Sequence, residues 1–139
     1  MRVLLDTSFL LPVVGVRVTE TASVLHRLWE LYKSREVELY YTDFNLLEIA
    51  WKLSKLSYDP FLVETGLKSI ERNMLKAQPE PSSALKALEL RRRGFRDVID
   101  LLLYQTAKDN GLNFLTCDIA LVNFLKNVGE DTSIVITSV

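Results

Sequence analysis

The amino-acid sequence predicts an α/β fold, a three-layer α/β/α sandwich around a central parallel sheet. Short apolar runs that fit strands alternate along the chain with longer segments whose apolar residues recur at helical spacing. The predicted strands are apolar along nearly their whole length, which is typical of parallel strands that helices cover on both faces.

The first element is a strand over 2–6 (RVLLD), in which only the first and last residues are polar. The turn-prone Thr7 and Ser8 lead from it into a short apolar piece. A helix follows over 19–33, because apolar side chains recur there at helical intervals and Thr19 is placed to cap it.

The middle of the chain predicts one strand, two helices and a linker. The strand covers 37–42 (VELYYT), and a strong helix over 43–56 ends before the turn signal Tyr58–Asp59–Pro60. A second amphipathic helix is predicted over 61–76. The polar, proline-bearing segment 78–83 (QPEPSS) is the clearest linker in the sequence.

The last part of the chain continues the alternation of helices and strands. Ser82 or Ser83 is placed to cap a helix that Gly94 ends, and Gly111 ends the next helix in the same way. The predicted elements are helix 84–93, helix 97–111, strand 112–118, helix 119–128 and strand 133–137.

Length, charge and cysteine content limit the class of protein. The 139 residues suit one domain, and we expect a single domain over 1–139. Seventeen basic and eighteen acidic residues give a net charge of −1, so a broadly basic surface is not predicted. Cys117 is the only cysteine, which excludes an internal disulfide. No apolar run is long enough to cross a bilayer, so we expect a cytoplasmic protein without a membrane partner.

Four acidic residues stand in apolar surroundings. Asp6 and Asp118 each follow a predicted strand and precede a helix. The carboxyl ends of parallel strands share one edge of a sheet, where ligands bind. Aspartate is also favoured as a helix N-cap, so the sequence leaves both roles open for these two residues.

Glu48, within LLEIAW, and Asp100, within VIDLLLY, lie inside predicted helices among apolar neighbours. Lys52, four residues after Glu48, could pair with it. Asp97 could cap its helix, with Asp100 at the third position of a capping box. If the four acids only cap helices or pair with a lysine, they have no common function. If they converge on one ligand, binding of that ligand explains all four.

Converging carboxylates raise one another's pKa values, and a hard divalent cation relieves their repulsion. Mg²⁺ and Mn²⁺ prefer carboxylate oxygen as a ligand. A bound cation lowers the pKa of water and stabilises charge on a phosphoryl oxygen, which is the chemistry of phosphodiester hydrolysis. His26 is the only histidine, so mechanisms that need two histidines are excluded.

Three segments, LLDTSFLL, TDFNLLEIAWKL and DLLLYQTAKDNGLNFLTCD, resemble in order and spacing the signature blocks of PIN-domain ribonucleases. The resemblance spans nearly the whole chain and implies the α/β/α sandwich together with an acidic site that binds Mg²⁺ or Mn²⁺ and cleaves RNA. The four acids of the family fall on Asp6, Glu48, Asp100 and Asp118. Three of them are expected to bind metal, and Glu48 to bind metal or to orient the attacking water.

Other residues are expected to support that site. The resemblance places hydroxyl groups that orient ligands or water at Thr7 or Ser8 and at Thr116. Asp97 lies on the same helix face as Asp100 and is its rival as a metal ligand. We favour Asp100, because its apolar neighbours leave it the greater need for a cation.

Two further predictions come from the residues themselves. Asn45 lies one turn before Glu48, where it either donates a hydrogen bond to that acid or caps the helix together with Thr42. A basic cluster suits phosphate contacts, but its residues also suit the carboxyl end of the preceding helix. The cluster consists of Arg91, Arg92, Arg93 and Arg96.

Many small single-domain PIN proteins are ribonuclease toxins of type II toxin–antitoxin pairs, and these toxins often dimerise and are inhibited by a small antitoxin. The resemblance therefore implies an RNA substrate, an antitoxin partner and a homodimer. One alternative is an RNA-processing nuclease without an antitoxin. Another is a non-catalytic metal-dependent binding module, because DTSFL partly matches an Asp-x-Ser-x-Ser loop, with Leu10 in place of the second serine.

Overall fold

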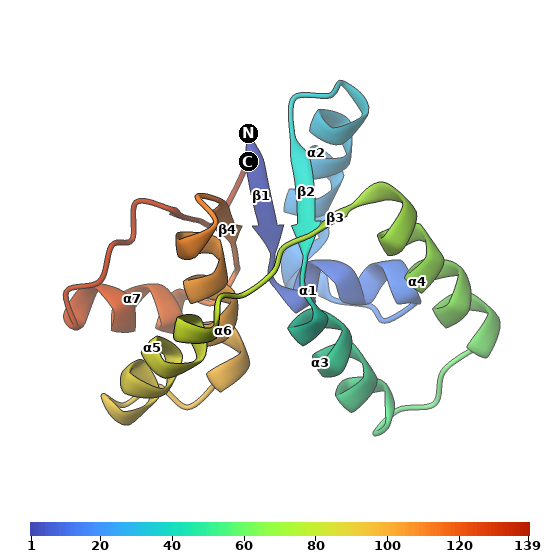
Figure 1. Cartoon of the computed structure of the whole chain (residues 1–139). Helices are drawn as coiled ribbons and strands as arrows, with labels where there is room; N and C mark the ends of the chain where they lie inside the picture. The colour runs from blue at the N-terminus through green and yellow to red at the C-terminus, as the bar shows by residue number, and fades with distance from the viewer.

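The computed structural model describes the whole chain, residues 1–139, as a five-stranded parallel sheet between two layers of helices (Figure 1). The strands are β1 (Arg2–Leu5), β2 (Glu38–Tyr41), β3 (Leu75–Lys76), β4 (Asn113–Leu115) and β5 (Val135–Ile136). Their spatial order is β3-β2-β1-β4-β5, and every pairing is parallel. The predicted α/β class with a central parallel sheet is confirmed.

Helices cover both faces of the sheet (Figure 1). One layer contains α1 (Thr7–Leu10), the 3₁₀ turns η1 (Leu11–Val14) and η2 (Thr19–Thr21), α2 (Ala22–Lys33), α3 (Asp43–Leu53) and α4 (Pro60–Asn73). The other contains α5 (Pro81–Arg92), α6 (Val98–Asp109) and α7 (Ile119–Asn127). No single helix is long and apolar enough to span a membrane. By length and composition alone, the segments Thr7–Val14 and Thr19–Lys33, bent by 108°, meet that requirement only as a pair.

The sheet is buried on both faces, because successive residues of a strand point to opposite sides. In β1, Val3 and Leu5 pack into the core under α1–α4, whereas Leu4 packs into the core under α5–α7. In β2, Leu39 joins the first core and Tyr40 the second. This double burial explains why the strands are nearly continuous apolar runs in the sequence.

The structure corrects the helix predicted over 61–76. The helix α4 ends at Asn73, and the backbone becomes extended at Met74. The chain then forms β3, in which Leu75 lies opposite Tyr40 of β2. A strand of two residues is too short to carry a periodic pattern, so only its pairing with a neighbouring strand identifies it.

Two predicted helix caps are wrong. Thr19 lies in η2, and α2 begins only after that turn. Ser82 and Ser83 lie inside α5, which starts at Pro81 because proline is well suited to the first helical position. The buried hydroxyl of Ser83 donates instead to the carboxylate of Asp109, which joins α5 to α6.

The helix ends follow local side-chain chemistry. The helix α3 ends at Leu53, earlier than predicted, where the hydroxyl of Ser54 donates to the carbonyl of Trp51 at 2.6 Å and competes with continued helix. Gly94 and Gly111 follow the ends of α5 and α6 as predicted, with φ of 124° and 66°. Glycine adopts this left-handed backbone without the strain that a side chain adds.

The helix α4 crosses η1 at very short range, and Gly66 makes this approach feasible. A Cβ atom on Gly66 would lie 2.2 Å from the carbonyl oxygen of Val13 and 2.8 Å from the Cα of Val14. The turn η1 continues from α1, which starts directly after Asp6. The contact therefore holds α4 against the segment that leads out of β1.

Candidate active site

The predicted acids lie at the carboxyl edge of the sheet, where the strand order reverses beside β1. The strands β2 and β4 flank β1 on opposite sides (Figure 1). Asp6 is the first residue after β1, and Asp118 is the N-cap of α7, which follows β4. Such a switch point is where open α/β sheets bind ligands.

Three carboxylates from three different elements converge at this edge. Asp6 follows β1, Glu48 lies in α3 and Asp100 lies in the first turn of α6, and one oxygen of each lies within 4.8 Å of the others. Asp6 is 7% exposed and Asp100 6%, while Glu48 is partly buried. The structure thus brings three of the four predicted acids together.

Burial and mutual repulsion raise the pKa values of two of these acids. Removal from water is the main cause that raises the pKa of Asp100 to about 9, and the negative charges of Asp6 and Asp97 add to it. Burial also raises the pKa of Asp6 to about 6, although a hydrogen bond from Thr116 and the charge of Lys52 act in the opposite direction. The cluster therefore retains protons at pH values where isolated carboxyl groups lose them.

The raised pKa values predict that the protein without divalent ions loses stability as the pH rises. Above the unfolded-state value of about 3.9, the folded chain holds more protons than the unfolded chain until the folded-state values are passed, so the free energy of unfolding falls. We expect a loss on the order of a few kcal/mol between about pH 5 and pH 9, measured by urea unfolding in EDTA. Asp100→Asn should flatten most of this slope, and an equally steep slope in that variant would contradict the prediction.

Thr116 connects Asp6 with Asp118. Its hydroxyl donates to the Asp6 carboxylate at 2.8 Å and accepts the backbone N–H of Asp118 at 3.0 Å. Asp118 also caps α7, because one carboxylate oxygen accepts the N–H of Leu121 at 3.1 Å. Asp118 lies outside the three-acid cluster but lines the same pocket, and its second oxygen accepts no hydrogen bond.

The structure separates the two rival acids of α6. The carboxylate of Asp97 caps the helix by accepting the N–H of Asp100 at 3.2 Å, as one of the sequence interpretations predicted. The side chain of Asp100 is free of that role and joins the cluster with Asp6 and Glu48. The geometry thus places Asp100, and not Asp97, in the cluster of acids.

Asn45 acts as a buried clamp under the site. Its side-chain oxygen accepts the N–H of Thr42 at 2.8 Å in a capping box, which agrees with one of the two predicted roles. The predicted alternative, a hydrogen bond to Glu48, is not formed. The Asn45 amide instead donates to the carbonyl of Leu5 at 3.0 Å and to the hydroxyl of Thr7 at 3.1 Å. Asn45 therefore ties the start of α3 to both neighbours of Asp6.

We expect Asn45→Ala to destabilise the fold by about 2–4 kcal/mol, because it removes the cap and leaves buried partners unsatisfied. Urea unfolding measures the loss. The matched control is Asn123→Ala, since Asn123 lies on the exposed side of α7 and its side chain forms no hydrogen bond. A control loss as large as that of Asn45→Ala would argue against a special role for the clamp.

The acids face a pocket of about 310 Å³. Its charged lining consists of Lys52 and six acids: Asp6, Glu20, Glu48, Asp97, Asp100 and Asp118. Ser8 also lines it, and the buried hydroxyl oxygen of Ser8 has no hydrogen-bond partner. Glu20 also lines the pocket because η2 brings it there, and no motif in the sequence predicts this position.

Other predicted residues lie away from the clustered acids. The arginines of the basic cluster are all exposed, and none lines this pocket. Arg91 and Arg92 occupy the last turn of α5, where a positive charge interacts favourably with the carboxyl end of the helix.

Cys117 lines the pocket of the acids. Burial and the nearby acids raise the pKa of its thiol, which disfavours a nucleophilic thiolate.

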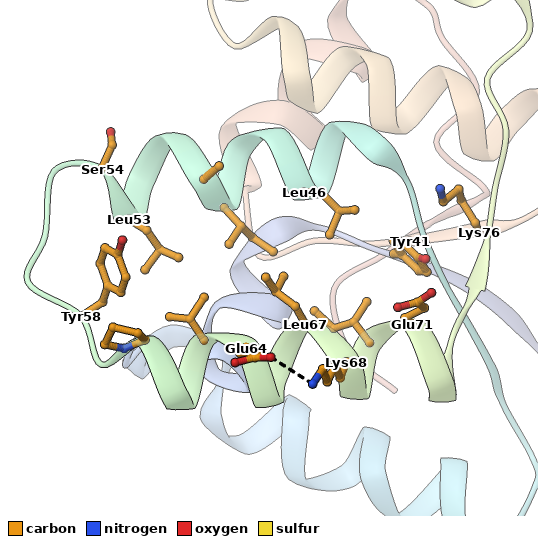
Figure 2. A pocket seen from close by; sticks show the side chains of 15 residues that line it. Tyr41, Leu46, Leu53, Ser54, Tyr58, Glu64, Leu67, Lys68, Glu71 and Lys76 are labelled. Atoms are coloured by element: carbon orange, nitrogen blue, oxygen red, sulfur yellow. Dashed lines mark ion pairs between the residues drawn. The ribbon is translucent and has the colours of Figure 1, made fainter.

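A larger hollow of about 770 Å³ lies between α3 and α4, and most of the residues that line it are apolar (Figure 2). Leu46 and Leu53 line it from α3, and Leu67 from α4. Glu64 and Lys68 form an ion pair of 3.0 Å along α4. The hollow contains none of the clustered acids, so the smaller pocket is the candidate active site.

The fold and the site together define an α/β protein with a buried carboxylate cluster at the switch point of its parallel sheet. The family model of the PIN domain matches residues 3–125. The chain therefore belongs to the PIN-domain family.

Comparison with solved structures supports this assignment of the fold. The structure of VapBC2 from Rickettsia felis, bound to a DNA fragment from their promoter, contains a chain that is similar over 89% of this chain and 93% of its own length, with a TM-score of 0.67 and 17% identity. A chain in the structure of FitAcB from Neisseria gonorrhoeae is similar over the same shares, with a TM-score of 0.57 and 15% identity. No curated protein matches the chain.

Proposed function

We propose that this protein is an Mg²⁺- or Mn²⁺-dependent endoribonuclease. The convergence of the Asp6, Glu48 and Asp100 carboxylates, with all three ligand oxygens within 4.8 Å of one another, is the observation that carries the proposal. Membership of the PIN-domain family supports it, because PIN domains are generally nucleases. The pocket opens at the sheet edge where α/β proteins bind ligands.

The residues present fit a hard divalent ion. The donors are carboxylate oxygens, which Mg²⁺ and Mn²⁺ prefer, and the raised pKa values of Asp6 and Asp100 show that the buried charges lack a compensating cation. Asp6, Glu48 and Asp100 would hold the ion, and Asp118 would join them from the edge of the pocket. Such an ion, when bound, lowers the pKa of water and offsets negative charge on a phosphoryl oxygen.

The protein's own contribution is to hold these groups in place. Thr116 orients Asp6 through its hydroxyl, and the Asn45 amide holds the Leu5 carbonyl and the Thr7 hydroxyl on either side of Asp6. Glu48 is the least buried member of the cluster, which suits a role in orienting the attacking water as well as in binding metal. Ser8 lines the same pocket, and its buried hydroxyl is not engaged by another group.

The test is incubation of the pure protein with single-stranded and structured RNAs in Mg²⁺, Mn²⁺ or EDTA. We expect cleavage with either metal and none in EDTA. Cleavage that persists in EDTA would overturn the metal-dependent mechanism. Metal binding, measured by calorimetry, without cleavage of any RNA would favour the non-catalytic binding module instead.

We further propose that the nuclease is the toxin of a toxin–antitoxin pair and is inhibited by a small partner protein. The support is the resemblance of this chain to small PIN toxins and its structural likeness to chains in the VapBC2 and FitAcB structures. Induced expression should arrest bacterial growth, and co-expression of the protein encoded next to it should restore growth. Normal growth during expression of an active nuclease would favour an RNA-processing role. A homodimer is also proposed, and analytical ultracentrifugation tests it.

A further inference from the structure

We propose that Lys52 is an RNA-binding residue that contacts a backbone phosphate next to the clustered acids. This inference rests on the proposed nuclease function and adds to it a positioning residue that the acids themselves cannot replace. Lys52 lies in α3, four residues after Glu48, and lines the candidate active site. Residues at this spacing share one face of a helix, so the lysine extends beside the acid.

The charge of the pocket creates the need for such a residue. Six acidic side chains line it, and Lys52 is the only cation among the lining residues. An RNA phosphate is itself negative, so it approaches this surface against repulsion that one divalent ion offsets only in part. A lysine at the rim supplies a mobile positive charge that attracts the phosphate without occupying the metal site.

Lys52 acts on the nearby Asp6 only through its charge and is not bonded to any of the acids. It forms no ion pair and no side-chain hydrogen bond, although Glu48 lies at the spacing that favours one. The same spacing in α4 does produce an ion pair, between Glu64 and Lys68 at 3.0 Å. The exposed ammonium group of Lys52 is therefore available to a ligand.

The next lysine along the chain, Lys55 just beyond the end of α3, provides a matched control. Lys55 is also exposed, but its ammonium group stacks over the ring of Trp51 at 4.3 Å from the centroid. Lys55 does not line the pocket of the acids. Lys52→Ala and Lys55→Ala each remove one exposed positive charge, the first from the last turn of α3 and the second from the turn just beyond it, so a difference between them reports on position and not on net charge.

The experiment measures binding and cleavage of fluorescently labelled single-stranded RNA in Mg²⁺ at several salt concentrations. Binding is measured by anisotropy in an Asp6→Asn background, so that the RNA remains intact. We expect Lys52→Ala to weaken RNA binding about tenfold and to lower the slope of log Kd against log salt by about 0.7. Cleavage by the otherwise unchanged protein should show a raised KM with little change in kcat, and Lys52→Arg should restore most of the binding.

Two outcomes would overturn the inference. One is an equal loss of binding in Lys55→Ala, which would indicate a general charge effect. The other is unchanged RNA binding in Lys52→Ala with an altered Mg²⁺ requirement, which would indicate that the lysine only balances the acids. If the protein with all four acids fails to cleave RNA, the proposed function is wrong, but the binding measurement still decides the role of Lys52.

Discussion

Asp6→Asn is expected to reduce RNA cleavage by at least about a thousandfold while the protein remains folded. The asparagine keeps the shape of the side chain, and its oxygen can still accept the hydrogen bond from Thr116. It loses the negative charge at the centre of the cluster, where Glu48 and Asp100 converge with it. Single-turnover cleavage in Mg²⁺ measures the effect, and circular dichroism monitors the fold.

Stability in EDTA provides an independent check of the same variant. Asp6 is buried beside two other acids, and burial disfavours its charged form, so removal of its charge should leave the melting temperature unchanged or raise it. The matched control is Asp59→Asn, because Asp59 caps α4 away from the acids and asparagine is an equally good cap. Cleavage by Asp6→Asn at the rate of this control would remove Asp6 from the proposed site.

Gly66→Ala should be among the most destabilising single substitutions in this chain, at about 3 kcal/mol or more. The added Cβ would meet the carbonyl oxygen of Val13 at 2.2 Å, and a backbone atom cannot rotate away as a side chain can. The helix α4 must then move off η1, and the contact of Ile70 with the core that contains Val14 is weakened. Urea unfolding measures the change.

The sign of the change in stability shows whether tertiary contact or helix propensity dominates at Gly66. Alanine is about 1 kcal/mol more favourable than glycine inside an isolated helix, so propensity alone predicts a gain in stability. Thr65→Ala on the exposed side of the same helix is the control and should be neutral or slightly stabilising. A stabilised Gly66→Ala protein would show that α4 and η1 are not in close contact.

The acids show which parts of the site the sequence could predict. Asp6 directly follows an apolar strand, and Glu48 and Asp100 interrupt apolar helical segments, so each is anomalous in its local setting. The cost of burying a charge makes such residues recognisable without a structure. The sequence could not predict how these acids lie relative to one another. It could not show that Asp118 lies at the edge of the cluster, because helix capping and metal binding both favour aspartate.

The residues that support the site were less predictable. The bonds from Asn45 to Leu5 and Thr7 join positions about 40 residues apart, and no local pattern reports such a pairing. Glu20 reaches the pocket because η2 brings it there, and its sequence neighbours do not distinguish it from a surface acid. These contacts depend on how the elements pack together.

The sequence by itself determined the parallel α/β class and marked Asp6, Glu48 and Asp100 as anomalous acids, because apolar periodicity and a charge among apolar neighbours are local signals. Only the tertiary structure decided the two-residue β3, the close approach at Gly66 and which of Asp97 and Asp100 joins the other acids. The strand β3 and the contact at Gly66 each depend on a segment that is distant in the sequence. The different positions of the Asp97 and Asp100 side chains depend on how α6 packs against its neighbours.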